Sequence, residues 1–266
     1  MRFCLLVMAK SPIPGQVKTR LCPPLTSEEA ADVAAASLLD TVEAALETPG
    51  AVPVVALAGV VRREDVREAL AECVVIPQRG DTFAERLVHA HADVARFRMP
   101  VLQIGMDTPQ VTPSLLASCA EFEEAALGLA LDGGWWALGL RDPLRAHVLR
   151  DVPMSRSDTG ARTLEALQSP QAWPITGAAE PRVRTLKSAP GLEVRTPEAA
   201  PSLQVRTPES MPGLEVRTPE AAPGLEVRTL PPLSDVDTMA DARAVAAQAP
   251  DTRFAATLLD IAAVTR

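Results

Sequence analysis

A short apolar run without alternation, residues 3–9, leads directly into a loop that contains Pro12, Pro14 and Gly15. Continuous apolar character is typical of a strand that is covered on both faces, whereas a strand with one face in water alternates. The prolines and the glycine prevent a helix from starting before Gly15. The opening therefore predicts a central strand of a layered α/β sheet, with the loop at the carboxyl end of that strand.

This loop concentrates positive charge. The first 27 residues contain four charged side chains, all of them basic, in a chain whose formal net charge is -8: Arg2, Lys10, Lys18 and Arg20. Ligands of open α/β sheets bind at the carboxyl ends of the strands, where backbone N–H groups and cations reach phosphates. We therefore predict a phosphate-anchoring loop, with a solvated basic turn as the alternative. The spacing matches neither G-x-x-x-x-G-K-[ST] nor G-x-G-x-x-G, so these two nucleotide motifs are excluded.

Length and composition are those of one α/β domain with an insertion, since the chain has 266 residues of which 47% are hydrophobic. The four cysteines form no C-x-x-C pair, and Met1 leads into a strand without a signal-peptide pattern, so we expect reduced thiols in a cytoplasmic protein. No apolar run reaches the roughly 20 residues that a membrane span requires. The acidic balance argues against nucleic acid as a partner and leaves small anionic ligands open.

Strands and helices alternate along the first half of the chain. Thr26 with Glu29 and Thr82 with Glu85 predict capping boxes for helices that run to about residues 46 and 97. Strands are expected at residues 52–58, 73–76 and 101–105, and a charged amphipathic helix at residues 63–72. This order predicts a doubly wound, mostly parallel sheet with helices on both faces.

Asp107 follows the strand at residues 101–105, and Thr112 with Pro113 starts the next helix. A carboxylate at the carboxyl end of a strand, opposite a phosphate loop, is suited to hold a divalent cation that bridges phosphate oxygens. The alternative is that Asp107 only caps a turn before Pro109.

Residues 127–140 predict a strand, a tight turn at Asp132-Gly133-Gly134 and a second strand. Glycines let the backbone approach a ligand closely, although they also simply make turns. Asp132 is a candidate site residue because it is a carboxylate in a loop that can face the site. Alternation places one of Trp135 and Trp136 in the core and leaves the other for stacking on a ligand.

Residues 9–21 resemble the Ala-Lys-x-Pro-x-Pro-Gly-x-Val-Lys-Thr-Arg-Leu opening of a family of predicted transferases with the glycosyltransferase-A, or nucleotide-diphospho-sugar transferase, fold. Three further elements of that family follow in its order: Gly-x-Asp-x-Pro at residues 105–109, Asp-Gly-Gly-aromatic at 132–135 and Asp-Val-Asp-Thr at 235–238. Gly80 and the Glu85-Arg86-Leu87 run stand where the family has a glycine-rich turn and Gly-Glu-Arg-[LM]. The resemblance covers residues 3–168 and 227–266, and implies a three-layer α/β/α, Rossmann-like fold with a mostly parallel central sheet.

The resemblance also implies a site for a nucleotide or a nucleotide sugar. Lys18, Arg20 and Asp107 form the implied catalytic set, with the two cations on the phosphates and with Asp107 and Asp237 holding Mg2+ or Mn2+. The implied nucleotide contacts are Ala9, Lys10, Gly15, Lys18, Arg20, Gly80, Asp132 and Gly133. Asp235 is the alternative to Asp237, which can also be a plain helix N-terminus. Leu129 and Leu131 replace the proline and glutamate that the family usually has before Asp-Gly-Gly.

Three functions stay open at this point. The first is metal-dependent glycosyl transfer from a nucleotide sugar to an unknown small acceptor. The second is nucleotidyl transfer from a nucleoside triphosphate to a small phosphorylated acceptor, and the third is nucleotide binding without catalysis. The same anchors serve both transfers, because stabilising a leaving diphosphate is an electrostatic task that needs no protein nucleophile.

A repeat of eleven residues precedes the C-terminal part. Val-Arg-Thr recurs at Val183, Val194, Val205, Val216 and Val227. Each unit has two prolines and few apolar residues, which argues against a long helix and against a solenoid core. We therefore interpret residues 182–229 as a Pro-rich insertion, disordered or extended, within a single domain at residues 1–266.

Overall fold

The computed structural model describes residues 1–170 and 223–264. The chain on either side of the gap, Met1–Gln171 and Pro223–Arg266, belongs to one compact unit. Most of the predicted insertion, up to residue 222, lies outside the described residues, and only its last Val-Arg-Thr copy falls in a described strand.

The unit is built on a seven-stranded sheet in the order β3-β2-β1-β4-β6-β5-β7. The strands are β1 (Phe3–Lys10), β2 (Ala51–Ala58), β3 (Val74–Pro77), β4 (Val101–Gly105), β5 (Ala125–Ala130), β6 (Trp135–Leu140) and β7 (Val227–Leu233). All neighbours are parallel except β6, which runs antiparallel to both β4 and β5. The predicted mostly parallel α/β sheet is therefore confirmed.

Strand β1 holds the central position that its sequence predicts, because both of its faces are covered. Phe3, Leu5 and Val7 pack into one buried cluster, and Leu6 with Met8 packs into the other. Every residue from Phe3 to Ala9 is buried. The absence of alternation in the sequence is thus the direct result of helices on both sides of the sheet.

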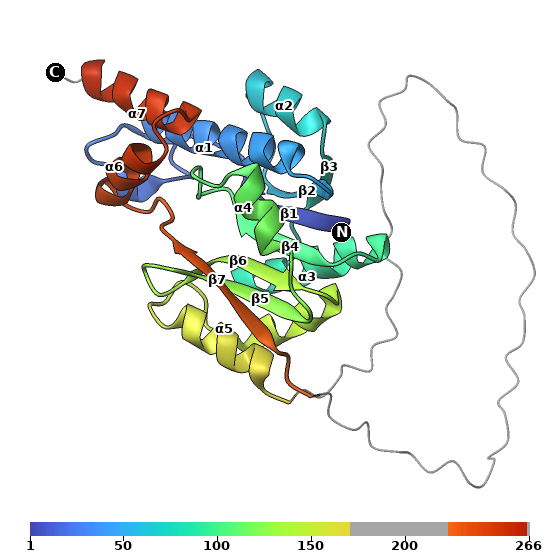
Figure 1. Ribbon diagram of the computed structural model, residues 1–266. Coiled ribbons are helices and arrows are strands. Elements are labelled where there is room, and N and C mark those ends of the chain that lie inside the picture. Colours follow the sequence, from blue (N-terminus) through green and yellow to red (C-terminus); the bar gives the residue numbers. More distant parts are fainter. Residues whose placement is uncertain (171–222, 265–266) are drawn as a thin grey trace, which may run out of the picture. The chain divides into compact units, whose positions relative to one another are not determined.

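Helices cover the two faces in separate sets (Figure 1). One face carries α1 (Ser27–Glu47), α2 (Glu64–Ala71) and α4 (Pro113–Cys119), and the other carries α3 (Phe83–Val94), the 3-10 segment η3 (Pro143–Asp151) and α5 (Thr159–Gln168). Short 3-10 turns lie at η1 (Thr19–Leu21) and η2 (Ala95–Phe97). Both predicted capping boxes are present, at the starts of α1 and α3.

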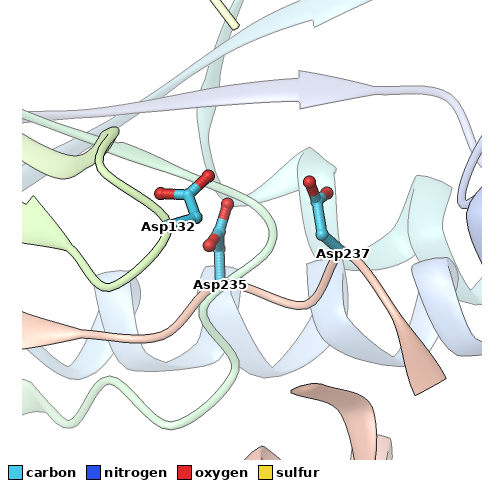
Figure 2. Close-up of side chains that lie close together, drawn as sticks. All are labelled: Asp132, Asp235 and Asp237. Atoms are coloured by element: carbon cyan, nitrogen blue, oxygen red, sulfur yellow. The ribbon is translucent and has the colours of Figure 1, made fainter. Parts of the chain in front are cut away.

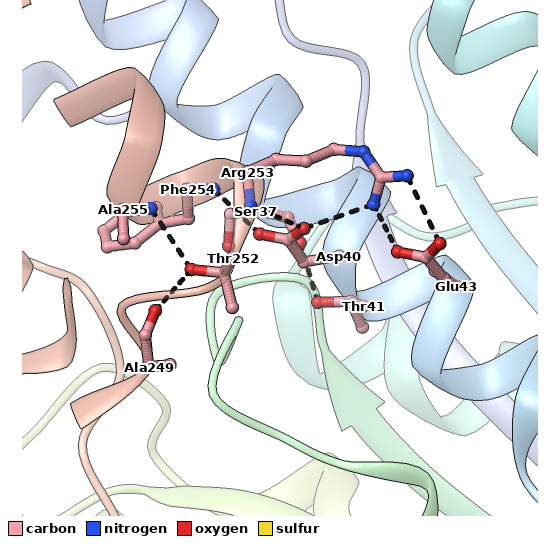
Figure 3. A network of polar contacts seen from close by, with 9 residues as sticks. All are labelled: Ser37, Asp40, Thr41, Glu43, Ala249, Thr252, Arg253, Phe254 and Ala255. Carbon is pink, nitrogen blue, oxygen red and sulfur yellow. Dashed lines mark hydrogen bonds and ion pairs between the residues drawn. The ribbon is translucent and has the colours of Figure 1, made fainter. Parts of the chain in front are cut away.

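The last two helices, α6 (Met239–Gln248) and α7 (Arg253–Val264), pack on the outer side of α1 through a third buried cluster that includes Phe254. A carboxylate of α1 caps α7, because Asp40 accepts hydrogen bonds from the backbone N–H groups of Arg253 at 3.1 Å and Phe254 at 2.8 Å (Figure 3). The Arg253 guanidinium also pairs with Asp40 and Glu43. Within the described part of the chain, no helix combines the length and the apolar content that crossing a membrane requires.

Candidate functional site

A pocket of about 570 Å³ opens at the carboxyl ends of β1 and β4. The turn between β5 and β6, the segment after β7 and the loop before α5 complete its wall. Six residues that the sequence assigns to the site line it together: Ala9, Lys10, Arg20, Asp107, Asp132 and Asp237. The sheet therefore brings these segments to one place, as ligand sites of α/β sheets require.

Strand pairing brings Asp132 next to the Asp235-Val236-Asp237 segment. Ala130 of β5 lies opposite Leu233 of β7 in a parallel pair. Asp132 lies two residues after Ala130, and Asp235 lies two residues after Leu233. The two segments therefore leave the sheet side by side. Ligand oxygens of Asp132, Asp235 and Asp237 all lie within 4.8 Å of one another (Figure 2).

The Asp132-Gly133-Gly134 turn is held in place by close backbone contacts. Gly133 has φ +90°, and a Cβ atom there would lie 1.9 Å from the carbonyl oxygen of Ser157. The N–H group of Gly160 donates to the carbonyl of Gly133 at 2.8 Å, and the N–H group of Gly134 donates to Asp132 Oδ1 at 2.8 Å. Glycine is thus required at 133 to seat the turn on the loop before α5, which positions the Asp132 carboxylate.

Like charges and burial act together on these carboxylates. Burial, together with the neighbouring charges of Asp132 and Asp237, raises the pKa of Asp235 to about 6, against the opposing effects of a backbone hydrogen bond and of Lys18. Three carboxylates in this arrangement repel one another unless a cation lies between them. Carboxylate oxygens are the ligands that Mg2+ and other hard divalent cations prefer, so the donor set fits such an ion.

Lys18 joins three segments beneath the pocket. Its Nζ lies 2.8 Å from Asp107 Oδ1 and also donates to the carbonyl of Val236, and its side chain is only 7% exposed. The N–H group of Val236 donates in turn to the carbonyl of Asp107 at 3.0 Å. Lys18 lines a smaller adjoining cavity of about 240 Å³ rather than the main pocket, and its assignment to phosphate stays a prediction.

Arg20 and Lys10 are the more accessible cations. The Arg20 side chain is 69% exposed and pairs with Asp237, while Lys10 Nζ donates to the carbonyl of Gln16 at 2.7 Å. Both residues line the main pocket and the smaller cavity. They are therefore placed to meet an anionic ligand that extends from one cavity into the other.

Three predicted contact residues shape turns and, among the described residues, are not part of the main pocket wall. Gly15 and Gly133 have positive φ in the loop after β1 and in the β5–β6 turn. Gly80 has φ +119° and packs its Cα against Glu85 of the capping box, where a Cβ would lie 2.6 Å from that of Glu85. Their contact with a nucleotide stays a prediction.

Several wall residues were not predicted from the sequence. Gln78 follows β3, Gln103 lies within β4, and Phe83 is the first residue of α3. One signal was available, because Gln103 interrupts the otherwise apolar strand at residues 101–105. Trp136 is buried in the core, whereas Trp135 is partly exposed, so the expected division between the two indoles is observed.

Comparisons with known proteins agree with this architecture. Residues 41–156 match the model of the family described as "Uncharacterized protein conserved in bacteria (DUF2064)". The fold is similar to that of a candidate nucleotide-diphospho-sugar transferase from Desulfovibrio desulfuricans, with a TM-score of 0.69 and 20% identity over 99% of this chain and 96% of that one.

Two further likenesses are weaker. Rv0371c from Mycobacterium tuberculosis, in complex with manganese, has a TM-score of 0.44 and 15% identity over 91% of this chain and 97% of that one. A cytidylyltransferase from Leptospira borgpetersenii has a TM-score of 0.39 and 13% identity over 60% of this chain and 68% of that one. No curated protein matches the chain. Residues 41–156 are thus similar to this uncharacterized bacterial family, and the chain has the fold of the candidate nucleotide-diphospho-sugar transferase.

Proposed function

We propose that the protein is a metal-dependent transferase that uses a nucleotide sugar, with Asp132, Asp235 and Asp237 as the ligands of Mg2+ or Mn2+. One observation carries the proposal: the three carboxylates converge within 4.8 Å at the wall of a pocket that also contains Lys10 and Arg20. A site that holds a divalent cation beside accessible basic side chains is suited to the diphosphate of such a ligand.

The residues of the pocket have different roles in the proposed reaction. A bound cation supplies positive charge to the diphosphate oxygens as the leaving group departs. Lys10, at the end of β1, and Arg20, in η1, contact the same diphosphate. Asp107 lines the same pocket, so it is available as a further ligand or as an acceptor for a hydroxyl group, and Lys18 keeps it in position.

This arrangement refines the metal site implied by the family resemblance. That resemblance pairs Asp107 with Asp237, whereas the convergence of Asp132, Asp235 and Asp237 within 4.8 Å supports Asp132 and Asp235 as ligands beside Asp237. Asp235 and Asp237 are then both ligands of the metal ion. Thr238, and not Asp237, is the residue that caps α6, which leaves the Asp237 carboxylate free of that role.

Turnover assays test the proposal. The protein is incubated with Mn2+ and a panel of nucleotide sugars and nucleoside triphosphates, and the released products are identified. Release of a nucleoside diphosphate from a nucleotide sugar supports glycosyl transfer, whereas release of pyrophosphate from a triphosphate supports the nucleotidyl-transfer alternative. Binding without either product supports the non-catalytic alternative.

A pair of variants connects any activity to the site. Asp235→Asn removes one proposed ligand, and Asp260→Asn removes an exposed carboxylate on α7 as a matched control. We expect the first to lose metal-dependent turnover and the second to keep it. Full Mn2+-dependent activity in Asp235→Asn is incompatible with the proposed metal site.

A further inference from the structure

A buried amide lies at the floor of the pocket. Gln103 occupies the middle of β4, where its partners on the two neighbouring strands are Leu6 of β1 and Leu138 of β6, both fully buried. The Gln103 residue is 2% exposed, yet it is part of the pocket wall. A polar side chain between two leucines is costly unless its hydrogen-bonding groups are satisfied.

Only half of that amide is satisfied by the protein. His91 on α3 is completely buried, and its Nε2 lies 3.0 Å from Gln103 Oε1. With Oε1 as the acceptor, Nε2 carries the proton and donates it. Burial also lowers the pKa of His91 to about 4, so the imidazole is neutral near pH 7. Among the described residues, no hydrogen bond uses the Gln103 N–H groups. The Gln103 Nε2 atom is also not one of the buried atoms without a partner, so it is accessible, and the pocket is the space that Gln103 lines.

A second glutamine in the same wall presents the opposite polarity. Gln78 Nε2 donates to the carbonyl of Ala9 at 2.9 Å and to the carbonyl of Ala56 at 2.8 Å. Both of its N–H groups are therefore used, and its Oε1 remains as an acceptor. Phe83, Trp135 and Met154 add apolar and aromatic surface to this pocket, while the carboxylates and basic side chains supply its charged part.

We propose that Gln103, positioned by His91, determines ligand specificity: its free N–H groups bind an uncharged acceptor atom on a ring of the nucleotide ligand. The acceptor is a carbonyl oxygen or ring nitrogen of the base, or a hydroxyl oxygen of the sugar, and the experiment below separates these sources. The inference rests on the proposed function, because it takes a nucleotide or nucleotide sugar as the ligand. His91 is a positioning residue, since it acts on the ligand through Gln103.

Stability provides the first discrimination between this role and a structural one. Replacing both members of a buried hydrogen-bonded pair with apolar groups of similar shape is close to neutral. We therefore expect the double variant His91→Leu with Gln103→Met to melt at or above the wild-type temperature while its ligand preference changes. A much lower melting temperature with an unchanged preference shows instead that the pair serves only the fold.

Binding measurements provide the second test that separates a role in specificity from a structural role. Dissociation constants are measured by calorimetry with Mn2+ for the nucleoside diphosphates of the four bases, and then for glucose, galactose and mannose derivatives of the preferred one. We expect Gln103→Met to bind its best ligand roughly three- to tenfold more weakly, the loss of about one hydrogen bond to an uncharged group. Gln103→Glu keeps the acceptor for His91 but has no N–H, so it should show at least the same loss.

The pattern of loss identifies the source of the acceptor. Reduced discrimination among the four bases assigns the contact to the base, and reduced discrimination only among the sugar derivatives assigns it to the sugar. His91→Leu should lose the same preference, and His91→Gln, whose amide can still donate to Gln103 Oε1, should retain it. Thr41→Val is the matched control, because Thr41 is buried in α1 and its hydroxyl group donates to the carbonyl of Ser37, away from the pocket wall.

Two outcomes overturn the inference, and they differ in whether the proposed function also fails. If the wild-type protein binds the nucleotides and both Gln103 variants keep its affinities and preferences, the inference is wrong and the proposed function stands. If the wild-type protein binds none of the nucleotides or nucleotide sugars, the proposed function fails and the inference fails with it.

Discussion

Lys18 Nζ lies 2.8 Å from Asp107 Oδ1, and this ion pair connects the loop after β1 to the carboxyl end of β4. The two side chains differ in environment, since that of Lys18 is 7% exposed and that of Asp107 is 42% exposed. Lys18 also has left-handed backbone geometry, with φ 47°. Lys10, the last residue of β1, thus lines the pocket, whereas Lys18 in the loop that follows turns into the protein and contacts Asp107 and the segment after β7.

The first prediction concerns this difference between the loop cations. Lys18→Met leaves the Asp107 carboxylate and the Val236 carbonyl without their shared donor, so we expect the free energy of unfolding to fall by about 1–3 kcal/mol. Arg20→Met removes an exposed side chain and should change it by less than about 0.5 kcal/mol. Urea unfolding with a constant m-value measures both, and equal losses contradict the structural role of Lys18.

The second prediction concerns metal affinity. Asp235→Asn should weaken Mn2+ binding at least tenfold in calorimetric titration, because it removes one of three converging carboxylates. Asp260→Asn should bind Mn2+ as the wild type does, since Asp260 lies on the surface of α7. Unchanged affinity in both variants places any Mn2+ site elsewhere.

The third prediction concerns pH in the absence of metal. The folded-state pKa of Asp235 is raised to about 6 from its ordinary value of 3.8, so the ionised carboxylate destabilises the folded protein above pH 6. That penalty disappears as the pH falls from about 6 toward 3.8, because the folded-state carboxyl becomes protonated. Asp235→Asn should therefore be about 1–2 kcal/mol more stable than wild type at pH 8. The gap in unfolding free energy should close near pH 4, and a gap that widens on acidification contradicts the prediction.

The fourth prediction concerns the anchoring of α7 on α1. Asp40 is buried and accepts two backbone hydrogen bonds from the start of α7, so Asp40→Ala should cost about 2–3 kcal/mol. Glu43→Ala removes an exposed partner of the same arginine and should cost less than about 1 kcal/mol. Thermal unfolding compares the two, and similar shifts in Tm show that the capping bonds contribute little.

The fifth prediction concerns the segment between α5 and β7. Its ends lie against each other, because the N–H group of Leu225 donates to the carbonyl of Leu167 at 2.8 Å and a Cβ at Gly224 would lie 1.8 Å from the carbonyl oxygen of Gln168. Replacing residues 171–222 with a short Gly/Ser linker should preserve the fold, with a gain of only about 0.6 kcal/mol per halving of loop length. Solubility and Tm check this expectation.

A second deletion serves as the comparison. Removing residues 186–229 makes the first Val-Arg-Thr copy the start of β7, but it places Glu180 and Pro181 where Gly224 and Leu225 now lie. A side chain replaces the glycine and the proline has no N–H to donate, so this variant should fold with a lower Tm than the linker variant. A higher Tm in the second deletion contradicts the role given to Gly224 and Leu225.

Local signals in the sequence predicted much of the fold. The uninterrupted apolar run of β1 implied helices on both faces, and Thr26 with Glu29 and Thr82 with Glu85 marked helix starts that the structure contains. These signals are reliable because they depend on residues that are close together in the chain. The same local reading indicated Asp107 and Asp132 as candidate site residues, because each follows a strand, whereas Asp237 was implied by the family resemblance.

Tertiary structure alone decided how those residues are grouped. The choice among the carboxylates depends on the pairing of β5 with β7, whose register puts Asp132 beside Asp235 across more than 100 residues of sequence. Lys18 and Arg20 look alike in the sequence, because both are basic residues of the same loop. Their side chains turn in different directions in the structure, and their exposed fractions differ tenfold. The pairing of His91 with Gln103 joins a helix to a strand across the core. Sequence alone could not determine these relationships, because each is set by the packing of segments that are distant along the chain.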